Sequence, residues 1–188
     1  MVRTRDADAA RLRILRAATA EFAAYGIAGA RMDRVAAQAE SAKERIYAYF
    51  GNKDELFEIV LTTVIRETLD AVDFDAADLP GYAGRMFDYF ADHPQAQRLT
   101  TWYRLERPSG SALRAVVEAN RTRLEALAAA QATGRIGAAF SPVELLTLVQ
   151  AIASSWGTMN PEFAGAAAAV DRASRRGAVV EAVRRLVA

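Results

Sequence analysis

Apolar side chains recur every three or four residues along most of the chain, which is the spacing of an amphipathic helix. Residues that favour turns interrupt the pattern at Gly26, Gly51, Pro94 and Pro161. The pattern predicts about nine helices, over residues 6–25, 32–39, 43–49, 53–72, 82–92, 95–106, 111–132, 142–159 and 166–187. The expected fold class is therefore all-α.

Two short helices joined by a tight corner, Glu40-Ser41-Ala42, occupy residues 31–53. Their apolar residues fall on one face of each helix, namely Met32, Val35, Ala36, Ala39, Ile46 and Phe50. Helices of two turns are not stable alone in water, so both are expected to pack against neighbours. The polar residues of the second helix then point outward, as in a helix-turn-helix whose second helix enters the DNA major groove.

The helices on either side are expected to supply the packing surface for this pair. In the helix over residues 6–25, the predicted apolar face consists of Leu12, Leu15, Ala18, Phe22 and Tyr25. The helix that begins at Lys53 is expected to bury Leu56, Phe57, Val60, Val64 and Ile65. Asn52 is a suitable N-cap for that helix.

Charge is unevenly distributed, although the net formal charge is only +1. Residues 1–53 hold ten Lys or Arg and six Asp or Glu, a balance of +4, and residues 54–188 hold fourteen and seventeen, a balance of −3. A basic amino-terminal third favours an anionic partner, whereas a chance asymmetry would look the same. Both lysines of the chain, Lys43 and Lys53, lie in the helix-turn-helix stretch.

The composition argues against catalysis and against metal or cofactor sites. The 188 residues include no Cys and one His, which excludes thiol chemistry and Cys-based metal sites. The sequence has no phosphate-binding Gly loop and no nucleophile elbow, so no catalytic residues, metal ligands or cofactor are predicted. It also has no signal peptide and no long apolar run, so a cytoplasmic location is expected.

The helix-turn-helix stretch and its flanks carry a family motif. The segment ILRAATAEFAAYGIAGARMDRVAAQAESAKERIYAYFGNKDELFEIV combines Phe22 and Gly26 with the Val35-Ala36 pair, the Ile46-Tyr47-x-Tyr49-Phe50 block and Lys53-Asp54-Glu55-Leu56. This segment resembles the DNA-binding domain of the TetR family of transcriptional regulators. The segment LPGYAGRMFDYFADHPQAQRLTTWYRLERP is similar to one subgroup of the family's helical effector domains. The resemblance implies a DNA-binding domain over residues 1–53 and an effector-binding and dimerisation domain over residues 54–188.

Three positions depart from the family pattern. Glu40 occupies the corner where family members usually have Gly, and Arg31 and Ala42 stand where small hydroxyl residues usually cap the second and third helices. Ser41 is expected to replace the missing cap of the third helix with a shift of one residue. The negative charge of Glu40 is expected either to weaken DNA affinity or to be neutralised by Arg34 or Arg45.

The resemblance implies seven DNA contacts: Arg31, Lys43, Glu44, Arg45, Tyr47, Tyr49 and Lys53. Arg45 is the best candidate for base recognition, because a guanidinium can bind guanine O6 and N7 together. Lys43 can do the same or bind phosphate, and Glu44 can accept from cytosine N4. Tyr47, Lys53 and Arg31 are expected to bind phosphates. For Tyr49 two roles are open: a contact in the groove, or packing on the first helix.

Two features of residues 54–188 suggest further functions. An aromatic-rich set is predicted to line a small-molecule cavity, although an ordinary core would use the same residue types; it comprises Met86, Phe87, Phe90, Trp102, Tyr103 and Trp156. Small residues in the last two helices would let helices approach closely, so this pair is expected to form half of a four-helix dimer interface. They are Ala151, Ala153, Ser154, Ser155, Ala173, Ser174 and Gly177.

The resemblance and the residues together predict a homodimeric, ligand-responsive transcriptional repressor that binds a palindromic operator. Two other classes stay open: a helical protein-interaction module, which explains the body but not the helix-turn-helix stretch, and an enzyme, for which the sequence offers no catalytic set.

Overall fold

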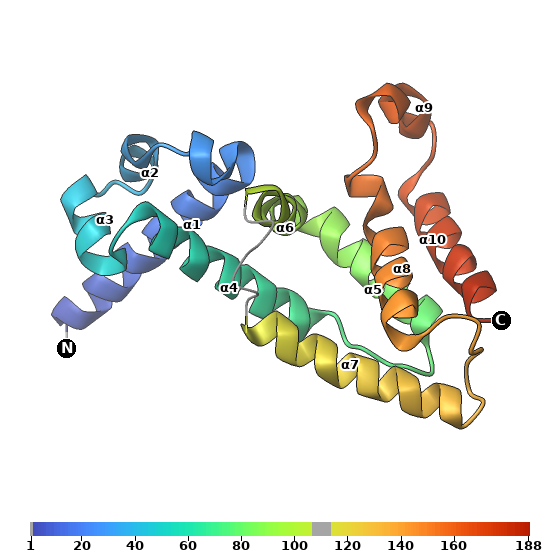
Figure 1. The fold of residues 1–188 in the computed structure, drawn as a ribbon. Coiled ribbons are helices and arrows are strands. Elements are labelled where there is room, and N and C mark those ends of the chain that lie inside the picture. The colour runs from blue at the N-terminus through green and yellow to red at the C-terminus, as the bar shows by residue number, and fades with distance from the viewer. Residues whose placement is uncertain (1, 107–113) are drawn as a thin grey trace. The chain divides into compact units, whose positions relative to one another are not determined.

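The computed structural model describes residues 2–106 and 114–188, which form ten α-helices and two short 3-10 helices (Figure 1). The helices are α1 (Val2–Gly29), α2 (Met32–Gln38), α3 (Lys43–Phe50), α4 (Lys53–Ala71), α5 (Leu79–Asp92), α6 (Pro94–Glu106), α7 (Arg114–Ala132), α8 (Pro142–Ser154), α9 (Ala164–Ala168) and α10 (Arg172–Leu186). The 3-10 helices η1 (Ser155–Gly157) and η2 (Pro161–Phe163) lie between α8 and α9. The described residues contain no strand, and the predicted all-α fold is confirmed.

The largest differences from the predicted helices lie in the segment after α8. That helix was expected to continue to residue 159, but it ends at Ser154 and is followed by η1. The short helix α9 was not predicted as a separate element, because its sequence, AGAAA, has no polar face. The predicted start of α7, at residues 111–113, lies outside the described residues. In the described ranges no helix is both long enough and apolar enough to cross a membrane.

The first helix bends at Gly26, where φ of 68° and ψ of −173° interrupt the helical geometry. Gly26 therefore ends the regular helix as expected, since glycine adopts positive φ without a Cβ clash. The predicted apolar face was wrong at Leu12 and Tyr25, which are 55% and 50% exposed. The buried stripe passes through Ile14, which lies about 200° around the helix from Leu12. It is made mostly of small residues: Ala10, Ala17 and Ala18, with Phe22.

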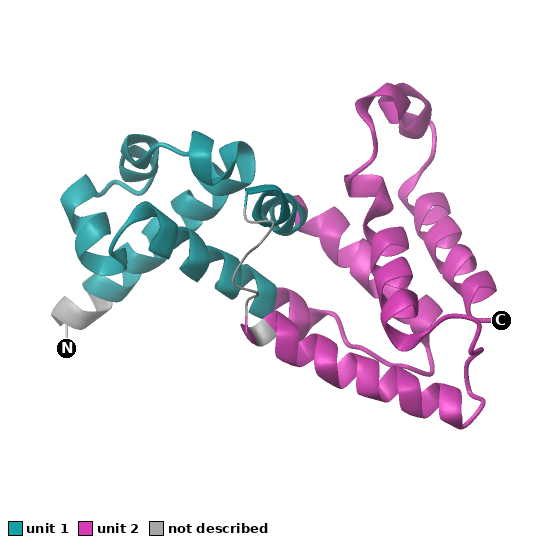
Figure 2. Ribbon diagram, viewed as in Figure 1, with its two compact units in different colours: residues 1–66, 95–111 teal, residues 67–94, 112–188 magenta. Residues whose placement is uncertain are grey.

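Packing divides the chain into two compact units (Figure 2). Unit 1 comprises residues 1–66 and 95–111, and unit 2 comprises residues 67–94 and 112–188. Helix α4 begins in unit 1 and ends in unit 2, and nearly all of α6 belongs to unit 1 although α5 and α7 belong to unit 2. The boundary expected after residue 53 separates a DNA-binding domain from an effector-binding domain, not two packing units. It stays a prediction.

Helix α5 is the centre of unit 2, where it packs against α8 and α10. Its Tyr82 side chain is fully buried, together with Leu145 and Val149 of α8 and Val183 of α10. Gly84 permits the close approach of α10, because a Cβ there would lie 2.8 Å from Nη2 of Arg176. Leu127 and Ala130 of α7 complete this core, which is thus built mainly from one face of each of four helices.

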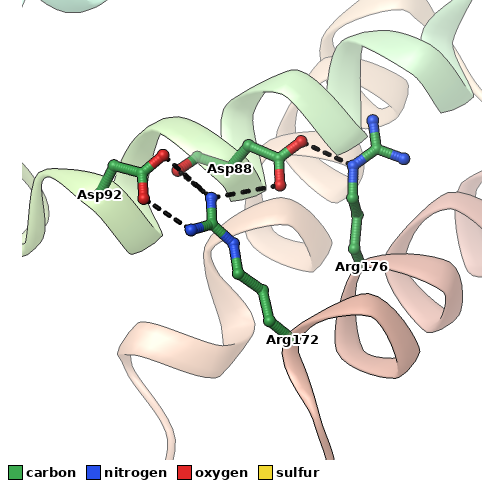
Figure 3. Close-up of polar contacts among 4 residues, drawn as sticks. All are labelled: Asp88, Asp92, Arg172 and Arg176. Atoms are coloured by element: carbon green, nitrogen blue, oxygen red, sulfur yellow. Dashed lines mark hydrogen bonds and ion pairs between the residues drawn. The ribbon is translucent and has the colours of Figure 1, made fainter.

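An ion-pair cluster joins α5 to α10 at the edge of this core (Figure 3). The guanidinium of Arg172 donates to both carboxylate oxygens of Asp92, at 2.6 and 2.9 Å, and lies 3.5 Å from Asp88. Arg176 donates from Nε to Asp88 at 2.6 Å. The hydrogen bond from Arg172 holds the pKa of Asp92 below its ordinary value. These side chains are partly exposed, so the cluster is expected to add little to the free energy of unfolding. Its geometry instead sets how α5 and α10 are aligned.

Candidate nucleic-acid interface

The helix-turn-helix is held in place by α1 and α4, as its short helices require. Ile46 and Phe50 of α3 are 0% and 3% exposed, which confirms their predicted place in the core. Behind them, Phe22 and Phe57 pack edge to face, with ring centroids 5.2 Å apart. Arg13 of α1 donates to the carbonyl of Ala39 at 3.3 Å, which satisfies an acceptor at the end of α2. The predicted buried residues of α4, from Leu56 to Ile65, are all buried.

The corner between α2 and α3 keeps a glycine-like geometry without glycine. Glu40 has a φ of 48°, and it is the only described residue other than glycine with positive φ. Ala42 takes the N-cap position of α3, and no side chain caps that helix. The expected role of Ser41 as the cap is wrong, because its hydroxyl is buried and has no hydrogen-bond partner in the described structure. The extended backbone that an N-cap needs is found at position 42, where the side chain is a methyl group.

A carboxylate from α1 takes the place of the missing cap on α2. Glu21 is 6% exposed and accepts from the amide of Arg31 at 2.7 Å and from Nε of Arg34 at 2.8 Å. Burial raises the pKa of Glu21, but the hydrogen bonds from Arg34 and from the Arg31 amide outweigh it, so the pKa lies below the ordinary 4.5. Arg34 is thus paired with Glu21, and the expectation that it neutralises Glu40 is not met.

The outer face of α3 presents the side chains that were predicted to contact DNA. Glu44 and Arg45 are exposed, and Tyr47 and Tyr49 are each 40% exposed. The ring of Tyr49 packs edge to face on Phe50 of the same helix, and its two expected roles, a groove contact or packing on α1, stay predictions. The side chain of Arg45 makes no hydrogen bond or ion pair within the described parts of the chain, and its guanidinium is free to bind a base or phosphate.

Lys43 is engaged within the protein, which the sequence did not predict. Its Nζ lies 2.9 Å from Oδ1 of Asp33, ten residues earlier on α2. This hydrogen bond raises the pKa of Lys43 and lowers that of Asp33. Both side chains are exposed, so a DNA phosphate can compete for the ammonium group. The sequence signal for this pair is an acidic residue, Asp33, in the first turn of α2 and a basic residue, Lys43, at the start of α3.

Lys53 lies at the start of α4, as predicted. Asn52 caps the helix: its Oδ1 accepts from the amide of Glu55 at 3.0 Å, and the Glu55 carboxylate accepts from the amide of Asn52 at 3.3 Å. The Nζ of Lys53 lies 3.4 Å from the carbonyl of Ala30. Amides at a helix start favour an anion, so Lys53 and the start of α4 suit a phosphate. Arg31, the remaining predicted contact, is exposed at the start of α2.

One face of α6 fastens the end of α1 next to the bend. Arg98 and Trp102 donate to the carbonyl of Ala23 at 2.7 and 3.2 Å, and Glu106 accepts from the amide of Ile27 at 2.6 Å. The three side chains are four residues apart, so they share a helical face. They satisfy backbone groups that the bend in α1 leaves without helical partners. Periodicity placed these residues on a helix but could not identify the backbone that they bind.

The predicted ligand-lining residues fall in both units. Met86 and Phe87 are buried in the core of unit 2, and Phe90 and Trp156 pack against that core. Trp102 and Tyr103 lie on α6 in unit 1. The assignment of all six residues to a ligand site stays a prediction.

The fold and this surface define a class: a helical protein with a helix-turn-helix. Its outer face presents two tyrosines and an arginine whose side chain has no partner among the described residues. Comparisons with known proteins agree. Residues 14–60 match the family model described as bacterial regulatory proteins, tetR family, and residues 78–185 match the tetracyclin repressor-like, C-terminal domain. The chain therefore belongs to the TetR family of bacterial transcriptional regulators.

Several relatives are similar over large parts of the chain. The solved structure of the transcriptional regulator SCO4942 from Streptomyces coelicolor is 44% identical, covers 94% of this chain and 97% of its own, and superposes with a TM-score of 0.85. The repressor SCO4008 of Streptomyces coelicolor is 48% identical over 54% of this chain and 53% of its own length. The repressor NicS of Pseudomonas putida is 35% identical over 50% of this chain and 48% of its own. The chain thus spans about half the length of the curated relatives it matches.

Proposed function

We propose that the chain is a cytoplasmic, sequence-specific transcriptional regulator, more precisely a repressor, that binds double-stranded DNA through α3. The observation that carries this proposal is Arg45, an exposed guanidinium without a partner in the described residues, on the outward face of a fully supported α3. Family membership and the names of the two curated repressors support it. No enzymatic activity is proposed.

The seven predicted contacts divide into two roles. Arg45 and Glu44, with Lys43 once it leaves Asp33, recognise base edges in the major groove. Tyr47, Tyr49, Lys53 and Arg31 bind the phosphate backbone and fix the register of the protein on the duplex. A single α3 reads few base pairs, so useful specificity needs a two-fold dimer on a palindrome whose half-sites are about 34–36 Å apart or a multiple of that.

The homodimer is proposed to form through the α8 and α10 region. Ala151 and Gly177 of the predicted small residues are exposed in the single chain, as are the larger Val143 and Leu148. Exposed apolar residues beside small ones allow the close helix packing of a four-helix interface. The interface is isologous, because the same two helices from each protomer meet around a two-fold axis.

Ligand binding in residues 54–188 is proposed to lower operator affinity. A small molecule can do this only by binding one dimer conformation more tightly than the other. A coupling free energy of about 1–3 kcal/mol would weaken operator binding about 5–150-fold.

The test is a gel-shift titration on the DNA upstream of the chain's own gene. Wild-type protein is expected to bind with a steep salt dependence, because bound phosphates release counterions. Arg45→Glu is expected to abolish specific binding. Arg114→Glu, on α7, changes the net charge equally and should bind like wild type. Equal binding by Arg45→Glu and wild type would refute the assignment of α3 to the groove.

A further inference from the structure

The cations of the helix-turn-helix differ in how firmly the protein holds them. Arg34 donates to Glu21, whose side chain is only 6% exposed, so this arginine is fixed within the fold. Lys43 donates to Oδ1 of Asp33 at 2.9 Å, and the two side chains are 40% and 74% exposed. The side chain of Arg45 has no partner in the ranges that the structure describes. Of these three cations, Lys43 is thus the one that can exchange an internal partner for a DNA acceptor.

Lys43 is placed where its own helix gains nothing from a cation. It is the first residue of α3, and a positive charge at that end opposes the helix dipole. Asp33 lies in the first turn of α2, where a carboxylate is favourable with or without a lysine nearby. The stability of the two helices therefore does not account for a lysine at position 43, whereas its place on the helix proposed to enter the groove does.

Asp33 is the principal anionic partner of Lys43. The hydrogen bond to Asp33 raises the pKa of Lys43, and the neighbouring Glu44 acts in the same direction with a smaller effect. The hydrogen bond from Lys43 in turn lowers the pKa of Asp33, with a smaller effect of Arg31. Both groups are charged at neutral pH, so they form an ion pair in the free protein.

We propose that Asp33 competes with the operator for Lys43 and thereby limits how tightly the chain binds its DNA. This inference rests on the proposed binding of DNA through α3, and it adds a residue that the sequence did not predict for this surface. Asp33 acts through Lys43 and is not itself a DNA contact.

Two costs arise when Lys43 moves to DNA. The ion pair with Asp33 is broken, and the carboxylate is left without its partner. That carboxylate lies at the start of α2, and the first helix of a helix-turn-helix crosses the phosphate backbone, which repels it. The free protein bears neither cost, so both lower the affinity for the operator. A moderate affinity suits a repressor that an effector must release, because the coupling between two sites is worth only about 5–150-fold.

The same competition fixes the sign of the effect on selectivity. At the operator, Lys43 leaves Asp33 to reach a base edge, so loss of Asp33 tightens this complex by the full cost. On a shuffled duplex the acceptors within reach are mainly phosphates, and Lys43 stays with Asp33 wherever the carboxylate is the better acceptor. Loss of Asp33 then tightens that complex by no more than the operator complex. Asp33 therefore lowers the preference for the operator or leaves it unchanged.

The test is a fluorescence anisotropy titration of the full-length protein with the DNA upstream of its own gene and with a shuffled duplex. Asp33→Asn is expected to bind the upstream fragment about 3–20-fold more tightly near about 0.1 M salt, counting both protomers. The gain should shrink at higher salt, because exposed charges are screened. Binding to the shuffled duplex should tighten by the same factor or less, and a larger gain there would contradict the competition.

Two further variants separate competition from net charge. Lys43→Gln removes the lysine, and in that background Asp33→Asn should tighten operator binding less than about 3-fold. Glu40→Gln removes an exposed carboxylate from the corner between α2 and α3, and its effect should be the same with or without Lys43. An equal gain from Asp33→Asn in both backgrounds would overturn the proposal, because the charge alone would then explain it.

The ion pair itself can be measured without DNA, because the chain has only two lysines, Lys43 and Lys53. NMR spectra of protein with isotope-labelled lysine side chains should show two ε-methylene signals, and Asp33→Asn should shift that of Lys43 alone. If it shifts neither signal, the pair is absent in solution and the proposal fails. Upstream DNA bound by wild type no better than the shuffled duplex would refute the proposed regulator and the competition with it. A clear preference for the upstream DNA that Asp33→Asn does not tighten would refute the competition alone.

Discussion

Glu40 adopts a backbone conformation that most residues avoid, and this gives a prediction at the scale of one residue. Its φ of 48° lies in the left-handed region, which costs a residue with a Cβ about 1–2 kcal/mol. Glycine avoids that strain but loses about 0.5–1 kcal/mol through the greater freedom of its unfolded chain. Glu40→Gly is therefore expected to raise the free energy of unfolding in urea by about 0.5–1 kcal/mol.

Glu40→Gln separates the backbone from the charge. It keeps the strained conformation, so its stability should stay within about 0.5 kcal/mol of wild type. Both variants remove a negative charge near the proposed DNA surface, and both should bind DNA more tightly at low salt. Equal stabilisation by Gln and Gly would mean that the charge, rather than the backbone, limits stability.

The lowered pKa of Glu21 predicts how the stability of the helix-turn-helix depends on pH. Its pKa in the folded protein lies below 4.5, so its contribution is complete above that pH and is lost as pH falls through the folded pKa. Glu21→Gln should lower the free energy of unfolding by about 1–3 kcal/mol at pH 7, because Arg34 and the Arg31 amide lose a charged acceptor. The gap between variant and wild type should stay constant from about pH 5 to 7 and narrow at lower pH.

The measurement is a series of urea denaturation curves between pH 3 and 7. Glu118→Gln is the matched control, since it breaks an exposed pair with Arg121 and should cost less than about 1 kcal/mol at any pH. A gap that widens below pH 4.5 would contradict the assigned role of Glu21.

The sequence did not predict which charged side chains of the helix-turn-helix pair with each other. The motif placed Arg45 and Tyr47 correctly on the outer face of α3, because helical periodicity alone decides which side of a helix is buried. It could not pair Arg34 with Glu21 or Lys43 with Asp33, because these pairs depend on how separate helices meet. Long charged side chains reach any of several partners, and only the tertiary structure selects one.

Among the elements, α3 begins without a side-chain cap, although its backbone is ready for one. Ala42 has φ of −72° and ψ of 144°, which is the extended conformation of an N-cap. Ala42→Ser is therefore expected to raise the free energy of unfolding by about 0.5–2 kcal/mol, because the serine hydroxyl accepts from an amide of the first turn. Thermal and urea unfolding measure the change.

Ala48→Ser provides the control for the cap. Residue 48 is exposed in the middle of α3, where serine is a poorer helix former than alanine and should destabilise by a few tenths of a kcal/mol. If both serine substitutions changed stability equally, the effect at position 42 would not come from capping.

The sequence predicted where the helices lie better than which helices pack against each other. Strong turn signals at Gly51, Pro94 and Pro161 placed most boundaries within a few residues of those observed. Periodicity did not reveal that α6 packs in unit 1 while α5 and α7 pack in unit 2. An amphipathic helix shows that one face is buried but not against which helix, so the sequence did not predict that Trp102 donates to a carbonyl of α1.

At the scale of the whole molecule, the proposed function depends on a dimer, and Gly177 offers a direct test of it. A Cβ added at Gly177 would meet no atom of the chain within 4 Å, so the fold of one protomer does not require glycine there. Glycine in a helix interior is about 1 kcal/mol less favourable than alanine. Its place on the exposed side of α10 suits the close approach of a helix from a second protomer.

Gly177→Gln is expected to convert the dimer to a monomer while the protomer keeps or gains stability. The glutamine side chain occupies the space needed by the partner helix, whereas its helix propensity favours α10. Sedimentation equilibrium measures the mass, and gel shift on the operator fragment measures DNA affinity, which should fall because one α3 reads only a half-site.

Gly165→Gln is the matched control, because a Cβ at Gly165 also meets nothing within 4 Å but lies on α9, outside the proposed interface. It should remain a dimer and bind the operator like wild type. If Gly177→Gln also stayed dimeric with full operator affinity, the protomers would have to meet through another surface. Val143 and Leu148, exposed at 57% and 36% on α8, would then need a different explanation. A monomeric wild type with full operator affinity would remove the need for two half-sites altogether.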